Sequence, residues 1–458
     1  MVFVRRQYFR LQEQDVFSYR TLFKMYLPVL VESVLVILMG LVDTLMASYL
    51  SDEATAGVSY VISITNWVTT FFNGLAVGAS VMTSQYLGRG RKSHAAASIR
   101  MSLFSTSLIA ALFCSVLMVD RAGVLQFLLG KIESKTLSHA VDYFTFMIPA
   151  YFFHTVIYVC TASMRAEGNT RTPMILSFLM MGVGLVLKCV FSYVLDLGAA
   201  GFSLATMIST ALAAAVGVFL LEFGKNNLRV FSRRHGARFF HMPMALRGVG
   251  NGLPVAIDSS LHNLGILLLS RLLVTYGVMH SAASGIATQV TPLINMANTC
   301  WGTVGLVVVG RTIGAGDKEQ AKRYFRVIMM LAIAVQLLSS VAGVLLAGNV
   351  ALLFGASAEV RELAAELIRM FAFFAIPFHP LAFAQPQLLR GAGDIKYTMW
   401  MSIAAMFLVR VLLGYVFGTL LGLGAVGLFA AMGVNWVARS VCFILRYRSG
   451  KWLNKKVT

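Results

Sequence analysis

The segment from Tyr26 to Leu50 constrains the chain most, because it is 25 residues long and almost entirely apolar yet contains two carboxylates. About 20 apolar residues in a helix span the hydrocarbon core of a bilayer, so this segment predicts a transmembrane helix. Its acids, Glu32 and Asp43, are eleven residues apart and lie about 20° apart around a helix axis. Charged groups at membrane depth usually face a bundle interior or a wet cavity. We therefore expect one face of this helix to line such an interior.

The same segment recurs in the second half of the chain. The segment LPVAIDS at 253–259 copies LPVLVES at 27–33 at an offset of 226. Pro254 corresponds to Pro28, and Asp258 corresponds to Glu32. Three other pairs keep an offset of 225 or 226, namely GRGRK at 88–92 with GAGDK at 314–318, RAEGN at 165–169 with RGAGD at 390–394, and LDLGAAG at 195–201 with LGLGAVG at 421–427. This steady offset indicates a duplication of six helices. Because six is even, both copies enter the membrane from the same side, which predicts parallel repeats.

Composition and the placement of charge agree with a polytopic membrane protein. The chain is 58% hydrophobic and 12% charged, with a mean hydropathy of +0.76, whereas soluble domains are about 25% charged. The net charge of +19 comes from basic residues that gather in alternate loops, as the positive-inside rule predicts for cytoplasmic loops. Both termini are therefore expected in the cytoplasm, and nucleic acid is not expected as a partner. The five cysteines have no CxxC spacing, which argues against a zinc or disulfide role.

Hydropathy predicts an all-α chain with twelve spans. They cover roughly 26–50, 57–83, 97–119, 139–164, 173–195, 199–222, 252–277, 283–310, 325–347, 365–389, 397–420 and 424–446. We expect an N-terminal six-helix lobe at 1–225, a cytoplasmic linker at 226–250 and a C-terminal six-helix lobe at 251–458. The linker is basic and contains no acid, so we expect it to lie on anionic lipid.

Motifs for chemistry are weak. The Gly-x-Gly loops at 88–90 and 314–316 follow membrane helices and lack the GK[ST] of a P-loop, so they predict tight turns with positive φ. No local pattern marks a nucleophile, and we do not expect an enzyme or a cofactor.

Longer motifs resemble those of one transporter family. The motifs are VDT at 42–44, SQYLG at 84–88, MRAEGNTRTP at 164–173, GRTIGAGD at 310–317 and LRGAGD at 389–394. Taken together, in this order and spacing, they resemble a multidrug and toxic compound extrusion (MATE) transporter, within the wider flippase-like superfamily. The resemblance implies twelve helices in two lobes that form a V, and efflux of organic cations coupled to entry of H⁺ or Na⁺. It also implies a coupling role for Asp43.

Polar sites on three helices depart from the family pattern. The fifth helix usually carries Asn-xxx-Asp, where this chain has Gly184 and Lys188. Acids of the seventh and tenth helices are replaced by His262 and His379. Na⁺ prefers oxygen ligands, and these replacements remove them, so we expect H⁺ as the coupling ion. The same replacements leave the usual preference for cationic substrates open.

Asp43 and Lys188 are expected at one depth. Each is seven residues from the outer end of its helix, or roughly 10 Å below the outer surface. Buried charges are normally paired. Two interpretations stay open, a permanent structural ion pair and a pair that opens when Asp43 takes a proton.

Further candidates for the cavity are polar residues near the midplane. His154 and His379 each lie eleven residues before the loop arginine of their half, while His262 is one turn beyond Asp258. Histidine titrates near neutral pH and suits a proton relay, but a membrane histidine also commonly makes an interhelical hydrogen bond. Arg410 could line the cavity or neutralise a carboxylate or helix end. Glu32 and Gln289 complete the set.

The sequence thus predicts a monomeric transporter of the inner membrane that exports drugs or organic metabolites in exchange for protons. Its expected partners are a small organic substrate, the coupling ion and membrane lipids. A flippase for lipid-linked sugars, with a more cationic cavity, is one alternative. A membrane-embedded enzyme that modifies lipids is another, and it would need a catalytic cluster at an interface.

Overall fold

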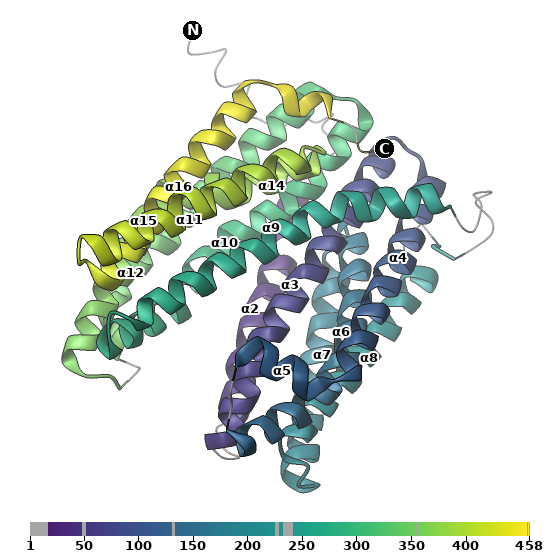
Figure 1. The fold of residues 1–458 in the computed structure, drawn as a ribbon. Coiled ribbons are helices and arrows are strands. Elements are labelled where there is room, and N and C mark those ends of the chain that lie inside the picture. Colours follow the sequence, from purple (N-terminus) through teal and green to yellow (C-terminus); the bar gives the residue numbers. More distant parts are fainter. Residues whose placement is uncertain are drawn as a thin grey trace. The chain divides into compact units, whose positions relative to one another are not determined.

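The computed structural model describes residues 17–47, 52–130, 133–224, 229–231, 241–352, 355–455 and 457, and these are helical with short connections and no strand (Figure 1). The helices of the first half are α2 (Tyr19–Ala47), α3 (Asp52–Gly88), α4 (Lys92–Val119), α5 (Arg121–Leu129), α6 (Ser134–Ala166), α7 (Arg171–Cys189) with the π-helix η1 (Val190–Val194), and α8 (Gly198–Phe223). Those of the second half are α9 (Met242–Val274), α10 (Val278–Ala315), α11 (Lys318–Leu352), α12 (Ala358–His379), η3 (Pro380–Ala384), α13 (Gln385–Gly391), α14 (Ile395–Ala404), η4 (Ala405–Val411), α15 (Leu412–Tyr415), η5 (Val416–Leu420), α16 (Gly424–Arg448) and the 3₁₀-helix η6 (Lys451–Asn454).

The predicted all-α membrane fold is confirmed. In the described part of the chain, eleven helices are long and apolar enough to cross a bilayer. The remaining predicted span, 57–83, lies within the 37-residue helix α3, whose many Ser, Thr and Asn residues make it more polar. Helices suit this setting because each satisfies its own backbone hydrogen bonds where water is absent.

The internal repeat extends to the backbone of the turns. Gly168 and Gly393, at φ of 83° and 99°, donate to the carbonyls of Arg165 and Arg390, with N···O distances of 2.8 and 2.9 Å. The π-helices η1 and η5 hold equivalent places in the two copies, and each closes with an i→i+5 bond. The donors of these bonds are Leu195 and Leu421, at 2.9 and 3.0 Å. At these turns both sequence copies therefore form the same backbone structure.

Two compact units divide the described chain. One comprises residues 17–26 and 257–457, and the other residues 27–256. The first turns of α2 therefore belong with the second half of the chain, and the first turns of α9 belong with the first half. The predicted lobe boundaries at 225 and 251 stay a prediction. Much of the predicted linker, 226–228 and 232–240, lies outside the described residues, and α9 begins at Met242, ten residues before the predicted span.

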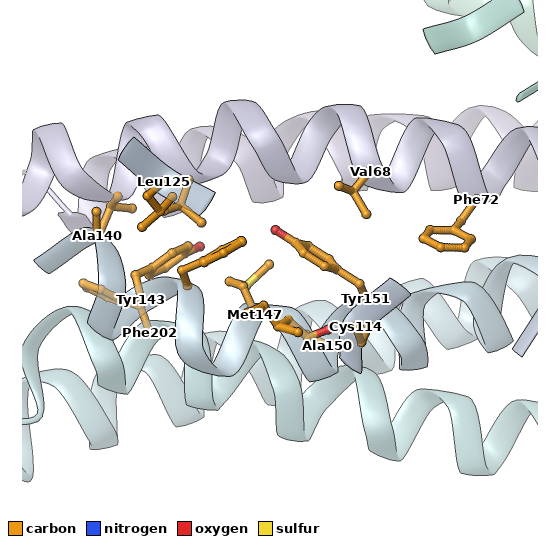
Figure 2. Close-up of a cluster of buried hydrophobic side chains, with 14 of the residues drawn as sticks. Val68, Phe72, Cys114, Leu125, Ala140, Tyr143, Met147, Ala150, Tyr151 and Phe202 are labelled. Carbon is orange, nitrogen blue, oxygen red and sulfur yellow. Dashed lines mark hydrogen bonds between the residues drawn. The ribbon is translucent and has the colours of Figure 1, made fainter. Parts of the chain in front are cut away.

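The core of the 27–256 unit forms around α6. Tyr143, Met147 and Tyr151 of this helix belong to one buried cluster with Val68 and Phe72 of α3, and Figure 2 shows Tyr151 near Val68. Other members of this cluster come from α4, α5 and α8. The Tyr151 hydroxyl is satisfied by Thr65 Oγ1 at 2.8 Å. In the other unit, α10, α11 and α12 pack on one another, and Trp301 and Trp436 are buried.

Candidate functional site: buried charges in the two repeats

A partly buried ion pair joins the first helix of the N-terminal repeat to the end of its fourth span. Glu32 lies one turn after Pro28 on α2, and Arg165 lies in the last turn of α6. Arg165 Nη2 donates to Glu32 Oε1 at 2.5 Å. Ser177 Oγ of α7 lies 3.5 Å from the same oxygen. The pair therefore joins three helices, and Glu32 Oε2 is buried without a partner among the described residues.

The C-terminal repeat makes the equivalent pair. Arg390 Nη2 donates to Asp258 Oδ2, and both side chains are buried. Arg390 Nε also donates to Thr398 Oγ1 at 3.3 Å. The four residues keep the repeat offset, 226 for the acids and 225 for the arginines. Glu32 and Asp258, which the sequence suggested as cavity residues, are thus brought against the loop arginines of their own repeats.

His379 is held in a buried polar network. Asn298 Nδ2 of α10 lies 2.8 Å from His379 Nδ1 at the end of α12. The same amide nitrogen also donates to Gln336 of α11, whose Nε2 donates to Ser340 Oγ at 2.8 Å. The imidazole stacks on Phe383, with ring centroids 4.4 Å apart. The network connects α10, α11 and α12 through one titratable ring.

An arginine that the sequence reasoning missed lies beside this network. Arg439 of α16 is 4% exposed, and its guanidinium carbon lies 4.5 Å from the centre of the Phe383 ring. Arg439 Nη2 donates to Ser402 Oγ at 3.0 Å. The sequence does give a sign of Arg439, because it is an arginine inside an apolar span. It has no counterpart in the other repeat, where Ala213 occupies the equivalent position.

The other predicted residues of this repeat divide between the cluster and the surface. His262 packs edge-on against Phe383, with ring centroids 6.2 Å apart, and interacts electrostatically with Arg410 and Arg439. His262, His379, Arg410 and Arg439 therefore surround one region of the C-terminal repeat. Gln289 of α10 is exposed, and its predicted place in the cavity stays a prediction.

In the N-terminal repeat, Lys188 is a buried cation. It is 3% exposed on α7 and interacts electrostatically with His154, whose ring stacks on Tyr158 with centroids 5.9 Å apart. A cleft of about 10 Å³ is lined by Met39 and Val42 of α2 and by Met181, Leu185 and Lys188 of α7. Lys188 therefore faces α2 beside Val42, the residue before Asp43. The side chain of Asp43 lies outside the described residues, so the predicted Asp43–Lys188 pair stays a prediction.

No group of three or more His, Cys, Asp or Glu in the described part of the chain could hold a metal ion. What the two repeats hold instead is a set of buried cations, buried histidines and paired carboxylates. Such groups can bind charged molecules and exchange protons.

Comparison with known proteins agrees with the duplication. A family model described as MatE matches residues 28–190 and again residues 254–416, so the two matched segments keep the same offset of 226. The chain is 26% identical over 452 residues to a protein called "Uncharacterized transporter YisQ" from Bacillus subtilis, with 95% of each chain covered. It is 25% identical over 451 residues to a "Probable multidrug resistance protein NorM" from Thermotoga maritima, covering 96% of this chain and 94% of that protein.

Solved structures show the same fold. A MOP superfamily transporter from Pyrococcus furiosus has a TM-score of 0.87 at 20% identity, with 95% of this chain and 96% of that chain covered. An outward-facing multidrug resistance transporter of the same superfamily has a TM-score of 0.86 at 21% identity, with coverages of 94% and 96%. Both similarities extend over nearly the whole chain.

Proposed function

Because the chain belongs to the MatE family, the multidrug and toxic compound extrusion transporters, we propose that it exports small organic molecules across the cytoplasmic membrane in exchange for protons. Its relatives called NorM and MdtK are named as multidrug resistance proteins, which supports efflux as the direction. The members of this family are multi-pass membrane proteins that transport small molecules across a lipid bilayer. The substrate, the coupling ion, the monomeric state and the cytoplasmic termini belong to the proposal.

The His379 network is the observation that carries proton coupling. Because an amide NH₂ donates, the Asn298 contact is a hydrogen bond when His379 Nδ1 is the unprotonated nitrogen of a neutral ring that carries its proton on Nε2. A proton arriving at Nδ1 would place two donors against each other. Asn298 would then have to turn away, which disturbs its bond to Gln336 and the packing of α10, α11 and α12. Protonation thus has a structural consequence in a helix bundle, as coupling requires.

The experiment uses purified protein in proteoliposomes with fluorescent organic dyes of either charge. We expect an imposed ΔpH to drive transport, and an imposed Na⁺ gradient at uniform pH to drive none. His379→Gln should lower ΔpH-driven transport by roughly 5- to 150-fold, the range of typical coupling energies. His94→Gln, at an exposed histidine, is the matched control and should transport normally. Sodium-driven transport without any response to ΔpH would refute proton coupling.

A flippase for lipid-linked sugars is the second candidate. The buried arginines of the C-terminal repeat favour it, because a lipid-linked sugar carries phosphate. Movement of a fluorescent phospholipid-linked sugar between leaflets in the same vesicles, with dyes left untransported, would select this function instead.

A further inference from the structure

The C-terminal repeat contains a buried arginine, Arg439, and a half-buried one, Arg410, that form no ion pair with a carboxylate among the described residues. Asp258 is bridged by Arg390, and the buried Asp394 accepts from both Arg446 Nε and Arg446 Nη2, at 2.5 and 2.9 Å. No ion pair of Arg410 or Arg439 occurs among the described residues, although Arg439 also senses Asp258 electrostatically. Two cations that interact with each other inside a membrane protein are costly without an anion.

Arg439 is oriented for an incoming acceptor. Its face is covered by Phe383 at 4.5 Å and by Phe443 at 5.9 Å, so only the edge of the guanidinium can make hydrogen bonds. Nη2 uses one bond on Ser402, while Nε is buried and has no partner among the described residues. A planar guanidinium with a free edge suits a carboxylate or phosphate.

Asn435 provides a second unsatisfied group on the same helix face. It lies one turn before Arg439 on α16, is fully buried, and neither Oδ1 nor Nδ2 has a partner in the described part of the chain. Buried polar groups are nearly always hydrogen-bonded. An amide NH₂ that is buried and unbonded one turn from Arg439 can donate to the same anion.

The repeat offset predicts that Arg410 lies beside Asn435. Their counterparts in the N-terminal repeat are Gly184 and Ser209, and a Cβ on Gly184 would lie 3.2 Å from Ser209 Oγ. The π-helix η4, which carries Arg410, packs against α16, which carries Asn435 and Arg439. Arg410 Nε is also buried and unsatisfied within the described residues.

The N-terminal repeat serves as an internal reference. Its equivalents of Arg410, Asn435 and Arg439 are Gly184, Ser209 and Ala213, all small and uncharged. The three polar side chains are therefore not required to form the six-helix fold. They belong to the C-terminal copy alone, as expected for a ligand site.

We propose that Arg410, Asn435 and Arg439 form an oxyanion site that binds the carboxylate or phosphate group of a small organic anion. The claim that this anion is the transported substrate rests on the proposed function. The claim that the anion binds to this site does not. The site makes this protein a transporter of organic acids or phosphate esters. An organic cation would meet two arginines there.

Equilibrium binding tests the site in full-length protein in phosphatidylcholine nanodiscs. Benzoate, phenyl phosphate and phenyltrimethylammonium share one ring and differ in charge. We expect calorimetric titration to detect the two anions and not the cation. Arg439→Gln and Arg410→Gln should each weaken anion binding by about tenfold or more, as loss of a charged hydrogen bond does. Arg271→Gln, at an exposed arginine of the same unit, should bind the anions normally.

Each outcome of these measurements supports or overturns the proposed oxyanion site or the proposed function. Tighter binding of the cation, or unchanged anion affinity in both glutamine variants, overturns the site. If a glutamine variant does not fold, Arg439→Lys keeps the charge but loses the planar fork, and unchanged affinity in that variant also overturns it. If phosphatidylglycerol in the nanodiscs displaces the anions from the wild type, a lipid headgroup is the ligand and the substrate assignment fails. Anion binding without ΔpH-driven transport refutes the proposed function and leaves the site standing.

Discussion

At the scale of single residues, the prediction to test is the buried ion pair between Lys188 and Asp43. Lys188 is buried and lines a cleft with Val42 of α2, one residue before Asp43. We expect Lys188→Met and Asp43→Asn each to lower the free energy of unfolding by about 3–5 kcal/mol, because each strands a buried charge. The double variant should be nearly as stable as the wild type. Thermal unfolding of all four proteins measures the coupling, with Lys92→Met as an exposed control.

Additive effects in this cycle would mean that the two groups do not touch. Transport driven by ΔpH separates the remaining interpretations. A structural pair predicts that the double variant still transports, whereas a coupling pair predicts stable protein without coupled transport.

At this scale the sequence identified both members of each ion pair but not that they pair. Glu32 and Asp258 were found from their repeat, and the loop arginines were found from theirs, but an offset relates residues along the chain and does not show which lie in contact. Arg439 was missed for the opposite reason, since it has no counterpart at Ala213 to draw attention to it. Asn298 and Gln336 were missed because neutral amides in apolar spans give no charge signal.

At the scale of elements, the start of α9 approaches α3 so closely that only glycine fits. A Cβ on Gly252 would lie 2.4 Å from the Leu75 carbonyl oxygen. We expect Gly252→Ala to cost about 1–3 kcal/mol, as overpacking does. Gly250→Ala is the matched control, because nothing lies within 4 Å of its new Cβ and alanine favours helix. Equal melting temperatures for the two variants would show that the helices separate easily.

The equivalent crossing of α2 is made differently. Tyr26 and Trp301 are the repeat equivalents of Gly252 and Leu75, and their rings stack with centroids 4.3 Å apart. The hydropathy of the sequence predicted the helices that cross here, but not their extent or their breaks. Apolar character ends where the lipid ends, while α9 begins earlier at Met242. The short helix α5 and the π-helices depend on local hydrogen bonds that hydropathy does not report.

At the scale of the whole molecule, residues 17–26 belong to the unit formed by the second half of the chain. Phe17 exchanges hydrogen bonds with the Tyr324 hydroxyl, at 2.6 and 3.0 Å, which secures this segment there. We expect a protease site inserted at 232–240 to yield nicked protein whose halves still elute together in detergent. The same nick in a variant lacking residues 1–26 should release the halves more readily. If the halves of the nicked full-length chain separate as fast as those of the nicked variant lacking residues 1–26, residues 17–26 do not hold the halves together.

The exchange of first turns also bears on ancestry. A six-helix precursor with both ends on one side of the membrane could pair with a second copy, each protomer lending the beginning of its first helix to its neighbour. Fusing the two genes would then preserve that domain-swapped homodimer within one polypeptide. Selection could afterwards alter one copy alone, and Arg410, Asn435 and Arg439 against Gly184, Ser209 and Ala213 are the differences such a history leaves.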